Sequence, residues 1–482
     1  MRNRFQNLTL LLALALMSVT GRLEAFTLGG PFTSWQATAI GYDLDAIVGR
    51  DDFSGPMNLS EEYRVNVPRL NYAFDATFLT YFGAQGETAI NQAFDVLNTL
   101  PSADSIDLNN YPLQAKGPIN FTALNLNLID IKSLTLGTLL AQIGIGAPER
   151  YVWCLRDRAT LPNNAGTNYL VIQRNFDPFQ PQIPTNAVNG TIYTYTIFDP
   201  VPGPTTSYAD AVERPVDPAA TDFSTVAGIE NPDPARGVNL GFGEYFTGLT
   251  REDVAAWKYL YSRANFNIED PPTGVTLSTN SSVNGSPFVI VGVSNLLATN
   301  VLVTTALRPG VGDLNFNRIV LDSLVGSVLN LTNEYVDNFI TNGSFESQVI
   351  ERVQTEPDIL FAAGDIGTDA FAMPLAVERT TSTSWNDNSA LNTLGSGAGE
   401  LYGPGVIEPN VVITFNRIGP HRLNANPFFQ DERTSSAGFA FGHFDTANIF
   451  AIFPNGSNVD EVENRIRAGE TTDPGLVSPF GP

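Results

Sequence analysis

Apolar residues recur three and four positions apart in three parts of the chain, as they do on one face of an α-helix. The spacing predicts helices over residues 87–100, 130–143 and 250–261. A turn over residues 83–86 precedes the first helix, and Pro101 ends it. Thr250 and Asp253 predict a capping box at the start of the third helix, because each side chain can bond a backbone N–H that the first turn leaves free.

Short alternating or β-branched apolar runs lie between these helices and after them, which is typical of strands. Before residue 263 the runs predict strands over residues 67–74, 119–128, 151–155, 169–174 and 191–198. After the Pro271-Pro272 pair they predict strands over residues 276–278, 288–293, 301–307, 411–415 and 447–453. One further helix is predicted over residues 319–340.

The change of pattern near Pro271-Pro272 predicts an α+β protein with two structural parts. The parts are an N-terminal segment over residues 26–65, a mixed α/β domain over residues 66–263, a linker over residues 264–274 and a β-rich, sandwich-like half over residues 275–482. We expect the domain boundary to lie within residues 262–276.

The first 25 residues have the pattern of a secretory signal peptide. Arg2 and Arg4 precede an apolar run over residues 8–17, and small or polar residues lead to Ala25. We expect residues 1–25 to be removed by a cut after Ala25. No later segment has the roughly 18 continuous apolar residues of a membrane helix. The protein is therefore expected to be secreted, periplasmic or at the cell surface.

The charge balance is strongly acidic. The chain has 50 Asp and Glu against 26 Lys and Arg, a net charge of -24. This charge repels the phosphates of nucleic acid, so we expect no nucleic-acid partner.

The chain has one cysteine, Cys154, so no intramolecular disulfide can form. Export without disulfides is typical of a bacterial envelope or extracellular protein. Cys154 lies in an apolar run, and we expect it to be buried and unreactive.

Few residues are suited to zinc or nucleophilic chemistry. His421 and His443 are the two histidines, and neither lies in an H-E-x-x-H motif. The sequence has no G-x-S-x-G elbow and no phosphate-binding glycine loop. We therefore expect no catalytic residue, no cofactor, no bound zinc, and structural roles for both histidines.

Two acidic stretches have oxygen ligands of the kind that calcium prefers. Residues 43–52 hold four aspartates, but their spacing fits no complete loop and favours a solvated turn. Asp313, Asn315 and Asn317 resemble the start of an EF-hand or dockerin-type calcium loop. That loop needs a glycine at its sixth position and an acid at its twelfth, where this chain has Arg318 and Leu324. Asp313, Asn315 and Asn317 are the candidate calcium ligands.

Three short motifs resemble a matrixin-type metalloprotease domain. They are the strand-like Leu-Asn-Tyr-Ala-Phe at 70–74, the helix-like Ala-Ile-Asn-Gln-Ala-Phe at 89–94, and Leu-Thr-Arg-Glu-Asp-Val-Ala-Ala-Trp-Lys-Tyr-Leu-Tyr at 249–261. The resemblance covers at most residues 66–263. No histidine occurs before residue 421, so it implies a scaffold without the family's zinc, and no catalytic residue carries over.

These observations favour a secreted, non-catalytic binding or structural protein, with partners in a bacterial envelope or extracellular matrix. Two alternatives remain open. One is a degenerate metalloprotease-like domain. The other is a secreted hydrolase that cuts polysaccharide with an unidentified carboxylate pair, for which Trp35, Trp257 and Trp385 are candidate sugar-contacting residues.

Overall fold

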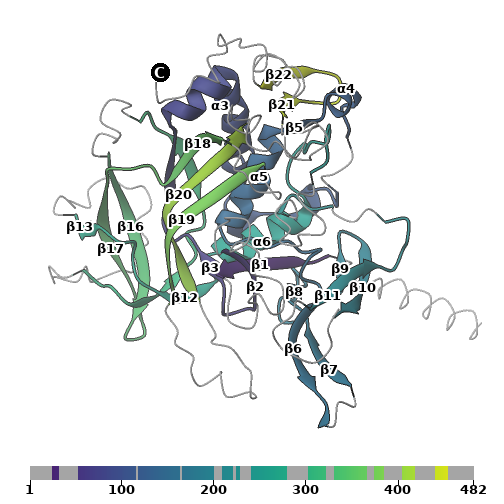
Figure 1. The fold of residues 1–482 in the computed structure, drawn as a ribbon. Helices are drawn as coiled ribbons and strands as arrows, with labels where there is room; N and C mark the ends of the chain where they lie inside the picture. The colour runs from purple at the N-terminus through teal and green to yellow at the C-terminus, as the bar shows by residue number, and fades with distance from the viewer. Residues whose placement is uncertain are drawn as a thin grey trace, which may run out of the picture.

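The computed structural model describes residues 24–31, 53–114, 118–162, 166–199, 209–220, 224–227, 240–278, 302–321, 331–365, 374–384, 404–417 and 440–453. These residues form a β-rich α+β fold with a six-stranded sheet at its centre (Figure 1). Helix α3 covers one face of this sheet with α5 beside it, and a five-stranded antiparallel sheet packs on the opposite face. The predicted fold class is thereby confirmed. Among the described residues, all helices lie before Ser262 and only strands follow it.

The central sheet joins strands from both parts of the chain. Its strand order is β15 (Asn315–Arg318), β4 (Arg69–Phe74), β18 (Ile359–Asp365), β20 (Gly405–Arg417) and β19 (Leu375–Ser384), with β3 (Tyr63–Arg64) paired to β20. Strand β4 lies parallel between β15 and β18, so a strand from before residue 263 is hydrogen-bonded to two from after residue 274. The expected division into two domains at the linker 264–274 is corrected: the two parts share one sheet.

Helix α3 (Ala76–Asn98) extends the first predicted helix toward the N-terminus. The side chain of its N-cap, Asp75, accepts a bond from the backbone N of Phe78 at 2.8 Å. The predicted turn over residues 83–86 is a kink within the helix, where Gly83 has φ 59° and ψ −162°. Phe78, Phe82 and Phe94 pack on the central sheet, and the Phe94 ring stacks on Tyr72 of β4 at 3.8 Å.

The two other predicted helices are confirmed. Helix α5 (Ile131–Gln142) begins at Asp130, whose Oδ2 accepts from the backbone N of Ser133 at 2.9 Å. Helix α6 (Arg251–Tyr261) begins with the expected capping box of Thr250 and Asp253. Its stripe of Val254, Trp257 and Tyr261 is buried, with exposures of 0, 2 and 0%.

The five-stranded sheet carries charged residues on its buried face. Its order is β12 (Phe266–Glu269), β14 (Ala306–Pro309), β16 (Leu331–Thr341), β17 (Ser344–Gln354) and β13 (Val275–Leu277). Buried Arg64 of the central sheet donates to Glu269 Oε1 at 2.7 Å, and buried Arg308 pairs with Asp337 at 2.9 Å. In each pair the buried charges have a partner of opposite sign, because a buried charge without one is costly.

Smaller sheets surround these layers. One has the order β2 (Phe53–Met57), β1 (Phe26–Pro31) and β8 (Asn175–Phe176), and another the order β11 (Asp210–Pro215), β10 (Thr191–Phe198) and β9 (Ala187–Val188). Strands β6 (Cys154–Thr160) and β7 (Thr167–Ile172) form a hairpin that extends from the body (Figure 1). The last sheet has the order β22 (Ile449–Phe453), β21 (Ala440–Phe444) and β5 (Leu128–Asp130).

Two predicted elements are wrong in type. Residues 119–128 contain the short helix α4 (Phe121–Asn125) instead of a strand, and its N-cap Asn120 bonds the backbone N of Ala123 at 2.9 Å. Residues 331–340 belong to strand β16 instead of a helix, because they pair along their length with β17. The predicted strand over residues 288–293 lies outside the described residues.

Candidate functional site

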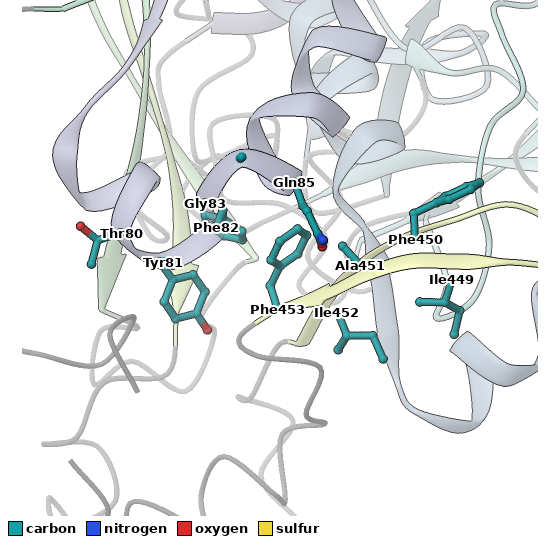
Figure 2. Close-up of a pocket in the computed structure, with 11 residues that line it drawn as sticks. Thr80, Tyr81, Phe82, Gly83, Gln85, Ile449, Phe450, Ala451, Ile452 and Phe453 are labelled. Atoms are coloured by element: carbon teal, nitrogen blue, oxygen red, sulfur yellow. The ribbon is translucent and has the colours of Figure 1, made fainter. Parts of the chain in front are cut away.

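An open pocket lies where the kink of α3 faces the edge strand β22 (Figure 2). Its volume is about 680 Å³, within the range of small-molecule sites. Residues 80–85 of α3 and residues 449–453 of β22 line it. The helix is broken at Gly83, and an added Cβ on Gly83 would meet no atom within 4 Å.

The strand wall of the pocket is shaped by a β-bulge. Strand β22 pairs with β21 on one side and forms the edge of its three-stranded sheet as described. His443 pairs with Ala451 and Phe444 with Ile449, which leaves Phe450 as the extra residue. A bulge of this kind re-aims a side chain. Phe450 accordingly stands at the pocket rim with 54% of its surface exposed.

The floor of the pocket belongs to the aromatic core. The Phe82 ring lies 5.2 Å from Phe453 and 5.7 Å from Phe441, both in edge-to-face contact. Phe82 also contacts Phe415 of the central sheet at 5.6 Å. Edge-to-face pairs are favourable beyond their buried area, so these contacts fix the kinked helix against β22. The pocket therefore has a rigid floor and an exposed aromatic rim.

The lining of the pocket is suited to apolar groups. None of its eleven lining residues is Asp, Glu, His, Lys, Arg or Cys. Thr80 uses its hydroxyl to donate to the Ala76 carbonyl at 2.6 Å, within its own helix. Gln85 supplies an exposed amide at the rim (Figure 2). This arrangement can hold an aromatic or aliphatic group, with the amide as a polar contact at the entrance.

His443 lies beneath the pocket rim, in a structural setting. Its ring packs 5.2 Å from that of Phe450, Nδ1 lies 3.3 Å from Asp130 Oδ1, and Nε2 lies 2.9 Å from Gln92 Oε1. Asp130 is also the N-cap of α5 and Gln92 lies within α3, so the imidazole connects β21 to both helices. With 6% exposure, His443 is positioned by neighbours on both sides of its ring. His421 lies outside the described residues.

One pair of carboxylates is held by a single arginine. Arg150 lies 2.6 Å from Asp210 Oδ2 and 3.5 Å from Glu213 Oε2, and all three residues are buried. Burial raises the pKa of Glu213 well above its usual range, while the Arg150 guanidinium opposes that rise. The two acids serve as partners of a buried cation instead of facing a substrate cleft.

A second group of acids surrounds the start of α6. Glu149 accepts from the backbone N of Ser224 and of Thr225, at 2.7 and 2.9 Å. Asp253 accepts from Val226 and Ala227 while it caps the helix.

Glu252 lies in the same group and is less well paired. Its Oε1 accepts from the backbone N of Asn189 at 2.8 Å, and burial raises its pKa well above the usual range. No hydrogen-bond partner of its Oε2 is found within the described part of the chain.

The calcium candidates are not brought together. Asp313 Oδ2 pairs with Arg263 at 3.1 Å, and Asn315 and Asn317 lie on strand β15. Alternate residues of a strand are separated by about 6.6–6.8 Å along the chain, so the oxygens are spread out instead of encircling an ion. Where the structure describes the chain, no three His, Cys, Asp or Glu side chains form a group that could hold a metal ion. The four aspartates within 43–52 lie outside those residues.

The remaining candidates are core residues or lie outside the described chain. Cys154 is fully buried, and burial raises the pKa of its thiol. Trp257 packs against Tyr261 at 5.1 Å inside the helical layer, so it is not available to a sugar. Trp35 and Trp385 are not among the described residues. Among the helices that the structure describes, none has the length and apolar content needed to cross a membrane.

The pocket residues were not identified from the sequence. The sequence predicts residues 449–453 only as part of a strand and residues 83–86 only as a turn. The one available signal is the pair of large apolar residues Phe450 and Ile452 on either side of Ala451 in a predicted strand. The comparisons with known proteins add no further assignment: no family model, no curated protein and no solved structure matches the chain.

Proposed function

We propose that the protein is an exported, non-catalytic binding protein that holds an apolar segment of an envelope or matrix partner in the pocket between α3 and β22. The observation that carries this proposal is the lining: an open pocket of about 680 Å³ with aromatic and aliphatic walls and no charged side chain. Apolar lining with a few polar contacts is typical of sites that bind by burial.

The position of the pocket on an edge strand favours a macromolecular partner over a small metabolite. An edge strand offers backbone N–H and C=O groups to an extended chain. The bulge at Phe450 limits continuous strand pairing and presents an aromatic ring instead. An extended peptide with one or two large apolar side chains fits both the edge strand and the exposed aromatic ring, because its side chains enter the pocket while its backbone follows β22.

A second candidate function is self-assembly through the outer face of the five-stranded sheet. The register places Val336 opposite Val349 and Ile340 opposite Phe345 on this face. Phe266, Val336 and Phe345 are exposed there by 38, 56 and 45%. Exposed apolar patches on a sheet mark interaction surfaces. Sedimentation of the wild type and of a Val336→Asp variant tests this candidate. Self-assembly through this face requires that the wild type forms oligomers and that the variant does not.

The enzymatic alternatives remain predictions. A carboxylate-pair hydrolase requires two acids that face an accessible cleft, whereas Asp210 and Glu213 are buried around Arg150. The matrixin-like resemblance carries no catalytic residue, because no histidine lies within residues 66–263. Neither alternative uses the pocket at α3.

The test of the binding proposal is a fluorescence titration with N-phenyl-1-naphthylamine, a neutral apolar dye. We expect saturable binding that is weakened in Ala84→Trp, because Ala84 is exposed at the pocket and an indole there occupies part of its volume. Ala76→Trp is the matched control, since Ala76 is exposed on the same helix away from the pocket. Equal dye binding by both variants would contradict the proposal.

A further inference from the structure

The residues just before strand β1 belong to the folded core. Ala25 is fully buried and packs with Val152, Val188 and Tyr193. Phe26 follows it in β1, also fully buried, with its ring 5.1 Å from that of Tyr259 on α6. A leader that is discarded after export does not contribute a side chain to a core cluster. The packing of Ala25 therefore places it in the part of the chain that stays.

Glu24 and Ala25 also supply partners to the start of α6. The carboxylate of Glu24 pairs with Arg251, and the backbone N of Ala25 donates to Glu252 Oε1 at 3.4 Å. The backbone N of Asn189 also donates to that oxygen. Loss of residues 24 and 25 would leave Arg251 without this carboxylate and remove a donor from a buried acid, which is costly.

A cut directly after Ala25 would have a further cost. The new chain would begin at Phe26, and its α-amino group would carry a positive charge next to a fully buried side chain. A charge placed in the interior loses its hydration. A cut on the N-terminal side of Glu24 keeps both partners of α6.

We propose that the leader is removed by hydrolysis of the peptide bond between Gly21 and Arg22. This inference rests on the export that is part of the proposed function. Gly21 is the last small residue before Glu24, it lies four residues beyond the apolar run that ends at Met17, and Val19 lies two positions before it.

The reaction is an ordinary peptide hydrolysis by a signal peptidase. Water adds its hydroxyl to the carbonyl carbon of Gly21, the C–N bond breaks, and the nitrogen of Arg22 leaves with a proton. Protonation at neutral pH makes it the α-ammonium group of the mature chain.

The first test is the N-terminal sequence and intact mass of the full chain after export by a bacterial host. The expected product begins at Arg22, and a Gly21→Leu variant is expected to lose this product. An exported product that begins at Phe26 would overturn the proposed cut while leaving export in place. A chain that keeps Met1 and stays in the cytoplasm would overturn both.

The second test measures what residues 22–25 contribute. Chains that begin at Arg22 and at Phe26 are produced without a leader, and their thermal midpoints are compared. The longer chain is expected to melt at higher temperature, and Glu24→Gln in that chain is expected to lose part of the difference, because it removes the charge opposite Arg251. Equal midpoints for the two chains would overturn the structural basis of the proposal.

Discussion

The rings of Phe82 and Phe453 meet edge to face with their centroids 5.2 Å apart, and this contact joins a kinked helix to the edge strand of a small sheet. Phe82 immediately precedes Gly83, whose positive φ breaks the helix. Phe453 is the last residue of β22. The contact anchors both elements on the core while the kink leaves space above them, and that space is the proposed binding pocket.

Helix α6 should be a major source of stability. Trp257 is 2% exposed and contacts Tyr261, so Trp257→Ala removes a fully buried aromatic ring and leaves a cavity. We expect a loss of about 3–5 kcal/mol in the free energy of unfolding, measured by denaturant titration. Phe121→Ala is the control, because Phe121 is a helical aromatic that is 71% exposed, and its change should stay within about 0.5 kcal/mol. Similar losses for both variants would contradict the assigned core.

Glu252 should make stability depend on pH. Burial raises its pKa in the folded protein well above the ordinary 4.5, so the folded state holds a proton that the unfolded state releases more readily. The contribution to stability is full below about pH 4.5 and is lost as the pH rises through the folded pKa. Glu252→Gln should show a smaller decline than the wild type, because Glu213, whose pKa is also raised by burial, still contributes to it. Glu334→Gln, on an exposed residue, should retain the full decline. Parallel pH profiles for the wild type and Glu252→Gln would refute the assignment.

Cys154 should be unreactive in the folded protein. Its side chain is fully buried, and burial raises the pKa of the thiol, so little thiolate is present at neutral pH. We expect no reaction with Ellman's reagent in native buffer and one thiol per chain in denaturant, since the sequence has one cysteine. Rapid labelling without denaturant would show that the thiol is accessible.

Local signals in the sequence were sufficient for several elements. The capping box at Thr250 and the N-cap at Asp130 mark the starts of α6 and α5, because these side chains bond backbone groups a few residues away. Strand β10 follows its β-branched and aromatic run over Thr191–Phe198. Each of these features depends on neighbours along the chain.

Two errors arose where apolar spacing fits more than one structure. Residues 331–340 have large apolar side chains at helical spacing, but the following Asn342-Gly343 pair adopts positive φ values of 50° and 77° and turns β16 back onto β17. That Asn-Gly pair is a hairpin signal present in the sequence. The leucines at 124, 126 and 128 alternate as in a strand, yet α4 ends between them.

The pocket and the buried ion pairs depend on contacts between distant parts of the chain. An arginine is usually exposed, so the sequence predicts Arg64 at the surface. In the structure it is buried against Glu269, which lies on another sheet. Phe82 and Phe453 are far apart in the sequence. Neither relationship has a local pattern, so neither is predictable from one sequence.

The most direct test of the pocket is site-specific photo-crosslinking in cells that produce the protein. Benzoylphenylalanine replaces either Phe450, at the pocket rim, or Leu170 on β7, which has the same 54% exposure far along the chain from the pocket. The proposed function predicts one discrete adduct from position 450, which is absent from position 170 and reduced when Ala84→Trp narrows the pocket. Identical adducts from both positions, or an adduct from position 450 that is undiminished with Ala84→Trp, would contradict it.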